Sequence, residues 1–224
     1  MAKVRFRISM SLDGFTSGPE QSVDNPLGIG GEGLHAWAIE LASWRRPHGL
    51  EGGEVNASTA VMEESLAGIG ATIMGRNMFG GHPGPWDPAR PWKGWWGANP
   101  PFHHPVFVVT HHARPPLALE GGTTFTFVTA GIEDALAQAR RAAQERDVAL
   151  AGGASIARAY LKAGLVDEME ISLAPVLLGS GERLFDGVGA LPELKLVRTV
   201  AAPGVTHFKF ARSSGSRAGT GRRR

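Results

Sequence analysis

Cysteine is absent from the 224 residues of this chain. Its absence excludes disulfide bonds and every mechanism that depends on a thiolate. No apolar run approaches the roughly 20 residues that a membrane-spanning helix requires. Residues 1–5 are followed by no long apolar stretch, so no signal peptide is predicted. We therefore expect a cytoplasmic protein with no membrane partner.

The chain contains enough apolar residues to bury a core, with 42% hydrophobic and 20% charged residues. Its net charge of +2 is unevenly distributed, because residues 213–224 contain four arginines and no acid. Removing those four charges from +2 leaves −2 for the rest. We expect one domain, 1–212, and a disordered basic tail, 213–224. Aromatic and basic residues are not interleaved, so no nucleic-acid partner is predicted.

Segments with strand and helix patterns alternate along the sequence. Strands are expected at 4–12, 71–74, 106–110, 123–128, 148–151 and 169–174, and helices at 34–44, 58–66, 132–143 and after Gly153. Ser58 is the expected N-cap of the second helix. Strands separated by helices predict an α/β fold with a mainly parallel central sheet flanked by helices. The last two expected strands, 194–200 and 205–211, predict an antiparallel C-terminal hairpin.

The most informative segment runs from Leu150 to Ala157, where an apolar strand ends at Gly152 and Gly153 and a helix begins. Glycine allows the backbone to turn sharply and to approach a ligand closely. The free N–H groups at a helix N-terminus suit a phosphate. This pattern predicts a nucleotide site; the alternative is a tight strand–helix connection that binds nothing.

Residues 28–33 match the G-x-G-x-x-G pattern of dinucleotide-binding proteins, but their context does not. A turn sequence precedes Gly28, and the first expected strand ends sixteen residues earlier. We interpret these glycines as a flexible loop.

Four segments, taken in order, resemble the dihydrofolate reductase fold, in the branch that includes the reductase domain of bacterial riboflavin biosynthesis. They are Ser11–Gly14, Gly75–Arg76, Thr110–Arg114 and the Gly152–Gly153 helix start, each after an expected strand. Residues 165–168 followed by 174–181 also look very like that branch. The resemblance covers residues 3–211.

The resemblance implies that NADPH lies across the carboxyl ends of the parallel strands. The residues it assigns to the cofactor are Ser11 and Gly14 near the nicotinamide, Gly75 and Arg76 near the phosphates, Thr110, His111 and Arg114 around the adenosine 2′-phosphate, and Gly152, Gly153, Ala154, Ser155 and Ile156 around the pyrophosphate. Arg114 is the best cation for the 2′-phosphate, because a guanidinium donates two parallel hydrogen bonds.

The sequence departs from these relatives at the substrate. Aligning Leu34 and Trp37 with the first helix of dihydrofolate reductases places Gly33 where a pterin-binding acid belongs. In the riboflavin-pathway enzymes a glutamate lies two residues before the glycine turn, where this chain has Leu150. Three residues remain as candidate proton donors: Asp24, Glu32 and His35. A bound water is an equal alternative.

A long loop, 80–101, contains four of the six tryptophans: Trp86, Trp92, Trp95 and Trp96. Loops of this length are usually functional or disordered, and such a tryptophan density argues against disorder. The loop is a substrate wall, a dimer contact or a small core of its own. No metal is predicted, because the neighbours in His103–His104 and His111–His112 point to opposite sides of an extended chain.

These observations predict an NADPH-dependent reductase of a small planar, heteroaromatic or conjugated substrate. The alternative is a non-catalytic nucleotide-binding or assembly protein on the same fold. We also expect a homodimer, because the apolar, glycine-rich segment 175–181 lies near the late strands.

Overall fold

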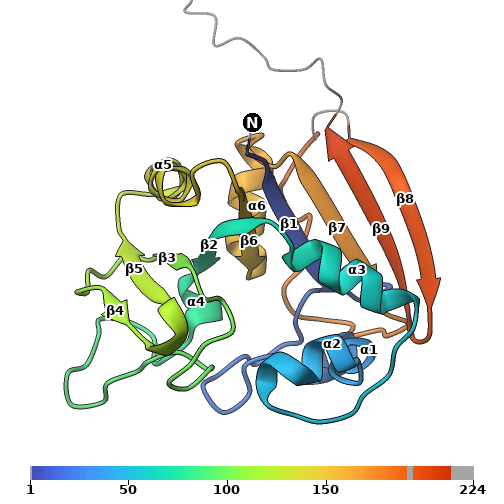
Figure 1. The fold of residues 1–224 in the computed structure, drawn as a ribbon, viewed down its shortest axis with the longest axis horizontal. Helices are drawn as coiled ribbons and strands as arrows, with labels where there is room; N and C mark the ends of the chain where they lie inside the picture. The colour runs from blue at the N-terminus through green and yellow to red at the C-terminus, as the bar shows by residue number, and fades with distance from the viewer. Residues whose placement is uncertain (1, 191–193, 213–224) are drawn as a thin grey trace, which may run out of the picture.

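The computed structural model describes residues 2–190 and 194–212; the predicted basic tail lies outside them. Nine strands form one sheet in the order β4-β5-β3-β2-β6-β1-β7-β9-β8 (Figure 1). The strands are β1 Val4–Met10, β2 Ile69–Gly75, β3 Pro105–Val109, β4 Leu117–Ala118, β5 Thr124–Val128, β6 Asp147–Gly152, β7 Glu168–Leu173, β8 Leu194–Ala202 and β9 Val205–Arg212. Six of them, β5, β3, β2, β6, β1 and β7, run parallel to one another.

The predicted C-terminal hairpin is confirmed, since β9 pairs antiparallel with both β7 and β8. The predicted mainly parallel sheet is confirmed as well. The short edge strand β4 was not predicted, because two residues give no periodic signal.

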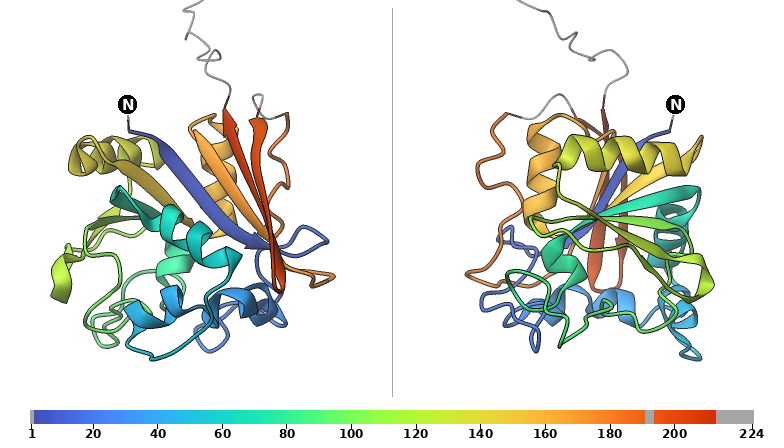
Figure 2. Two further views of the ribbon diagram at one scale, coloured as in Figure 1. Left: turned by 45° about the vertical axis from the view of Figure 1, so that its right-hand side comes forward. Right: turned by 90° about the vertical axis from the view of Figure 1, so that its left-hand side faces the viewer.

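The helices are η1 Gly31–Leu34, α1 Ala36–Ile39, α2 Ala42–Arg45, η2 Arg46–His48, α3 Ala57–Leu66, α4 Arg76–Phe79, η3 Glu120–Gly122, α5 Ile132–Ala143 and α6 Ala154–Lys162. The main core joins α5 and α6 to one face of the sheet. The helical segments α1 to α3 lie on the other face (Figure 2). Alternation along β1 places Val4 and Phe6 in the main core and turns Arg5 and Arg7 toward that second face.

The single helix expected over 34–44 is wrong: the segment is η1, α1 and α2, interrupted at Leu41. Leu41 has extended backbone angles and forms an isolated parallel bridge with Glu54. Two backbone hydrogen bonds hold it there, from Ala42 N–H to Glu54 and from Glu54 N–H to Glu40. Pairing with a distant segment therefore overrides the helical spacing of the apolar residues.

Helix α3 forms as predicted, but its N-cap is Asn56 and not Ser58. The Asn56 side chain accepts a hydrogen bond from the Ser58 amide at 2.9 Å, and Thr59 completes a capping box. Ser58 is buried instead, with its hydroxyl 2.9 Å from Nε2 of His207.

The glycines of 28–33 do not form a dinucleotide-binding turn. No strand leads directly into Gly28, because β1 ends at Met10, and a short 3-10 helix follows at Gly31. Gly18 and Gly28 let two backbone segments cross, since a Cβ on Gly18 would lie 1.9 Å from the Ile29 carbonyl oxygen. Their requirement for glycine is steric.

Candidate functional site

Two glycine turns meet where β2 and β6 end side by side. A Cβ on Gly75 would lie 3.5 Å from the Cβ of Ile156 and 3.8 Å from the Gly152 carbonyl oxygen. A Cβ on Gly153 would meet no atom within 4 Å. The peptide bond between Gly152 and Gly153 is cis. The turn therefore has open space in front of Gly153 and packed protein behind Gly75.

Helix α6 begins directly at this open space. Gly153 is its N-cap and supplies no side chain to the first amides. The N–H groups of Ala154, Ser155 and Ile156 belong to the first turn, where an α-helix offers no intrahelical acceptor. Ser155 is exposed, whereas Ala154 and Ile156 are buried. These three residues and the glycine pair fit a pyrophosphate, as the resemblance implies.

Arg76 and Arg114 both lie over the indole ring of Trp86. Their guanidinium carbons are 3.6 and 4.9 Å from its ring centroid. Arg76 donates to the carbonyls of Gly80 and His82, and Arg114 donates to the Trp92 carbonyl at 2.7 Å. Burial lowers the pKa of both groups, and Arg114 lowers that of Arg76 further. Within the described residues neither forms an ion pair, so this double positive charge suits a phosphate.

The backbone around Arg114 is held in place from two sides. Buried Thr110 accepts a hydrogen bond from the His112 amide at 3.2 Å. The Trp86 indole donates to the His112 carbonyl at 2.8 Å. His111 is exposed. The Thr110–Arg114 segment is thus a fixed loop that carries one partly buried cation, Arg114.

The tryptophan loop packs as a small core on β2, β3 and β5. Trp86, Trp92 and Trp96 contact a buried cluster that includes Phe79, Phe125 and Phe127. Trp95 packs edge-on against Trp92, with ring centroids 4.6 Å apart. Of the three expected roles, substrate wall, dimer contact and small core, these contacts fit a small core. Trp96 also lines a cavity.

Ser11 and Gly14 lie in the turn after β1. Ser11 is buried; its hydroxyl donates to Asp13 Oδ1 at 2.5 Å and accepts from the Phe15 amide at 2.9 Å. Gly14 has a positive φ of 88°. The Asp13 carboxylate therefore helps to hold this turn through Ser11.

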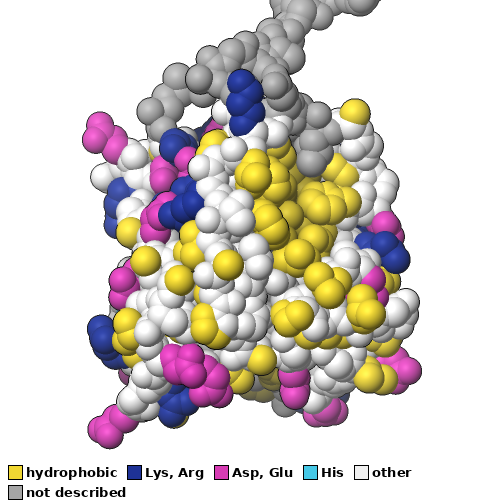
Figure 3. Space-filling model, turned by 90° about the vertical axis from the view of Figure 1, so that its right-hand side faces the viewer, with side chains coloured by type: hydrophobic (Ala, Val, Ile, Leu, Met, Phe, Trp, Pro, Cys, Tyr) yellow, Lys and Arg dark blue, Asp and Glu magenta, His cyan; other side chains and the backbone are white. Residues whose placement is uncertain are grey.

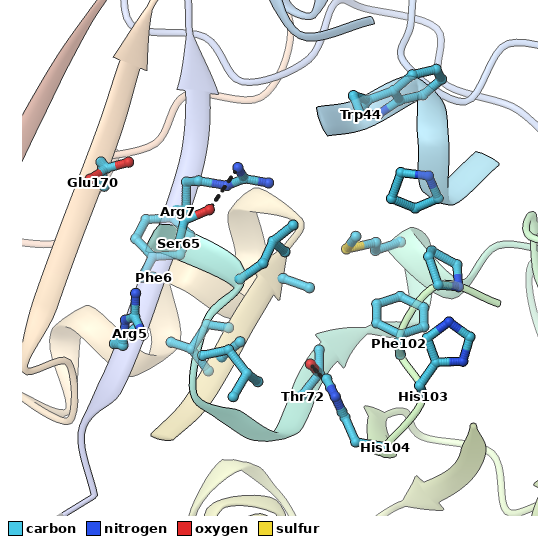
Figure 4. A pocket seen from close by; sticks show the side chains of 18 of the residues that line it. Arg5, Phe6, Arg7, Trp44, Ser65, Thr72, Phe102, His103, His104 and Glu170 are labelled. Atoms are coloured by element: carbon cyan, nitrogen blue, oxygen red, sulfur yellow. Dashed lines mark hydrogen bonds between the residues drawn. The ribbon is translucent and has the colours of Figure 1, made fainter. Parts of the chain in front are cut away.

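A cavity of about 600 Å³ opens on the second face of the sheet, between β1, β6 and the helices α2 and α3 (Figure 4). Ala151 and Met78 line its end nearest the glycine pair, and a Cβ on Gly152 would lie 3.6 Å from the Met78 sulfur. The cavity thus adjoins the predicted cofactor turn. No sequence motif marks it.

One wall of the cavity is aromatic and the opposite wall is charged. Trp44, Trp96 and Phe102 form the aromatic wall, together with His104, whose Nε2 lies 2.7 Å from the Thr72 hydroxyl. Burial lowers the pKa of His104 to about 4, so its ring is neutral at pH 7. Figure 4 shows Arg7 reaching from β1 toward this wall, with its hydrogen bond to Ser65 drawn.

The three candidate proton donors are not brought together. Asp24 is exposed in the loop before η1 and Glu32 is exposed within η1, and neither lines the cavity. His35 is half-buried, and burial and the charge of Arg7 lower its pKa, so it is close enough to sense a cavity residue. The 34–44 segment supplies Ser43 and Trp44 to the cavity, and α3 supplies Ser65 and Leu66.

Both side chains of the pair His103–His104 contact other residues of the protein. Nδ1 of His103 lies 2.9 Å from the Gly121 carbonyl oxygen, and His104 faces Thr72. In the part of the chain that the structure describes, no group of three or more His, Asp or Glu side chains is arranged to hold a metal. Across the same residues, no helix has the length and apolar character needed to cross a membrane.

Comparison with protein families gives a match over nearly the whole chain. The model of the RibD C-terminal domain matches residues 2–208. Among curated proteins, the uncharacterized protein YyaP of Bacillus subtilis (strain 168) is 44% identical over 54 residues, which are 24% of this chain and 29% of that protein. The chain thus aligns with less than a third of this relative.

Solved structures show the same fold. A putative riboflavin biosynthesis protein from Shewanella sp. PV-4 superposes with a TM-score of 0.61 at 19% identity, over 94% of this chain and 99% of that one. A Thermotoga maritima diaminohydroxyphosphoribosylaminopyrimidine deaminase/5-amino-6-(5-phosphoribosylamino)uracil reductase gives 0.53 at 12% identity, over 95% of this chain and 57% of that one. The chain spans little more than half of the Thermotoga protein, whose name includes a deaminase as well as a reductase.

Proposed function

Because the chain belongs to the RibD C-terminal domain family, a family of reductases, we propose that it is an NADPH-dependent reductase of a small planar, conjugated substrate. One observation carries the proposal: an open glycine turn at the start of α6 adjoins a cavity of about 600 Å³ through Met78 and Ala151. A nucleotide on the turn and a substrate in the cavity would share that boundary.

The residues around the turn fit NADPH in charge and in space. The first amides of α6 and the open face of Gly153 suit the pyrophosphate. Arg76 and Arg114, both without a carboxylate partner in the described residues, suit the 2′-phosphate. When bound, the dihydronicotinamide supplies a hydride to an electron-poor carbon of a C=C or C=N bond and leaves as NADP⁺.

The protein's own residues orient the substrate and let a proton reach the atom that is double-bonded to the hydride-accepting carbon. The aromatic wall holds a planar ring by contact with Trp44 and Phe102. Among the described residues that line the cavity, none of Asp24, Glu32 and His35 is found, so of the expected proton sources a bound water remains.

Turnover tests the proposal. The oxidation of NADPH is followed by its absorbance with pteridines, flavins and quinones as acceptors. Any acceptor that gives turnover above the rate without enzyme supports a reductase.

The second candidate, a nucleotide-binding protein without catalysis, is favoured by the exposed positions of Asp24 and Glu32. It predicts that NADPH binds and that no acceptor in the panel is reduced.

A further inference from the structure

The charged wall of the cavity holds more cations than anions. Nine ionic side chains form a cluster here, from β1, β6, β7, β8, β9, α3 and the residue before β1. Five of them, Arg5, Arg7, Glu168, Glu170 and Lys209, line the cavity, and each of the other four pairs with one of these. The cations are Lys3, Arg5, Arg7, Arg198 and Lys209, and the anions are Glu64, Asp147, Glu168 and Glu170. Five positive charges thus meet four negative ones.

Each carboxylate in this cluster is already paired with a cation other than Arg7. Glu168 bonds Lys3 at 2.5 Å and Lys209 at 3.2 Å. Glu170 bonds Arg198 at 2.9 Å, and that guanidinium also pairs with Glu64.

Asp147 completes the set of paired carboxylates, since it bonds Arg5 at 3.3 Å. Among the described residues of this cluster, the cation without a carboxylate partner is Arg7.

Arg7 has only uncharged partners within reach. Its Nη1 donates to the Ser65 hydroxyl at 2.9 Å and contacts the Met62 sulfur. In the residues that the structure describes, no carboxylate oxygen lies within 4 Å of its guanidinium. Burial lowers the pKa of Arg7, and the more distant Glu170 offsets this only in part. A desolvated cation without a counter-ion is costly, so this position favours an anion supplied from outside.

The geometry leaves room for such an anion inside the cavity. Arg7 points from β1 into the cavity, toward the aromatic wall that contains Phe102 and Trp44 (Figure 4). Burial and the charge of Arg7 lower the pKa of His35, and of His207 to about 4. Both rings are therefore neutral at pH 7 and do not repel an anion.

We propose that Arg7 binds a carboxylate carried on the planar substrate, while the substrate's ring lies against the aromatic wall. The proposal rests on the proposed function for the identity of the cavity as the substrate site. Guanidinium and carboxylate match as a planar, two-point pair, and charge-assisted hydrogen bonds of this kind are among the strongest in proteins. The substrate class is then a conjugated or heteroaromatic carboxylic acid.

A matched ligand pair tests this assignment without any nucleotide. Binding of 2-naphthoate and of 2-naphthamide, which share the ring and differ in charge, is measured by calorimetry. The wild-type protein should bind the carboxylate at least tenfold more tightly. Arg7→Met should lose that preference and keep its affinity for the amide within about twofold. Arg146→Met, which removes an equal charge elsewhere on the cavity lining, should keep the preference.

Several outcomes would overturn the assignment: equal binding of the two probes by the wild-type protein, a preference that survives in Arg7→Met, or no binding of either probe at millimolar concentration. A melting curve of each variant verifies that it is folded, and Arg7→Lys supplies a second, charge-conserving variant that should retain part of the preference. NADPH titrations of the same samples report on the proposed function separately, because probe binding requires no cofactor.

Discussion

Asp13 accepts a hydrogen bond from the backbone N–H of Gly179 at 2.7 Å, which ties the turn after β1 to the 175–181 segment. The Leu178 amide donates to the same carboxylate, and the Ser11 hydroxyl donates to it at 2.5 Å. Led by the bond from Ser11, these contacts hold the pKa of Asp13 at about 2, below its ordinary 3.8. Two loops that begin at the ends of neighbouring strands are thereby fixed to each other.

This contact predicts a defined pH dependence of stability. The folded pKa is depressed, so the stabilisation is present above about pH 4 and is lost as the pH falls toward 2. Asp13→Asn should melt at a lower temperature than wild type at pH 7, and the difference should narrow between about pH 4 and pH 2. Thermal unfolding across this range measures it, with the exposed Asp186→Asn as control. A constant difference at all pH values would show that the carboxylate charge is not involved.

Arg114 should set the preference for NADPH over NADH. Removing one charge-assisted contact costs roughly 1.5–3 kcal/mol, so Arg114→Met should raise the Kd for NADPH about 10- to 100-fold. The Kd for NADH should stay within about twofold. Arg90→Met, in the tryptophan loop and paired only with Asp87, is the matched control. An equal rise in the Kd values for NADPH and NADH would show instead that Arg114 acts by holding the loop in place.

A side chain at position 153 should leave the folded protein stable but should interfere with NADPH binding. A Cβ there meets no atom within 4 Å, and its φ of −77° suits any residue. Gly153→Val should therefore have the melting temperature of the wild-type protein. Its Kd for NADPH should rise at least tenfold, because the new side chain fills the space that the cofactor would occupy. Gly152→Val is the contrast: its φ of 115° disfavours a side chain, so stability should fall too. An unchanged NADPH affinity of Gly153→Val would show that the nucleotide does not bind at this turn.

We propose that the protein forms a homodimer through its late strands and the 175–181 segment. Figure 3 shows hydrophobic side chains gathered on the side of the molecule where β8 and β9 lie. Leu177 is 72% exposed and Leu196 is 54% exposed. Leu177→Glu and Leu196→Glu should each shift the sedimentation mass toward the monomer, whereas Val55→Glu, in the loop before α3, should not. A wild-type monomer at micromolar concentration would refute the dimer.

The sequence predicts the sheet well because its strands are short apolar runs bounded by turns, and local pattern decides such elements. It fails at Leu41, where pairing with Glu54 across twelve intervening residues decides the conformation. It also fails at the N-cap of α3, because Ser58 is drawn into a buried contact with His207 on β9. Both differences come from long-range contacts that local patterns do not encode.

The two halves of the site were predictable to different degrees. The glycine turns are local motifs, so the sequence predicts where they lie along the chain; that a cofactor binds there stays a prediction. The cavity is assembled from side chains of β1, α2, α3 and the tryptophan loop, which no motif links. The sequence signal for the cavity is Arg5 and Arg7 on β1. A strand between two parallel neighbours is usually apolar, so two charges on it indicate a polar region beside the sheet.

The most direct test of the account is a titration with NADPH and then NADH, followed by quenching of tryptophan emission and by energy transfer to the nicotinamide. Trp86, Trp92 and Trp96 lie beside the predicted phosphate and cavity residues, so a bound nucleotide should change their emission. The account predicts saturable NADPH binding in the micromolar range and weaker binding of NADH. Failure of both nucleotides to bind would contradict it and would make the glycine turns purely structural.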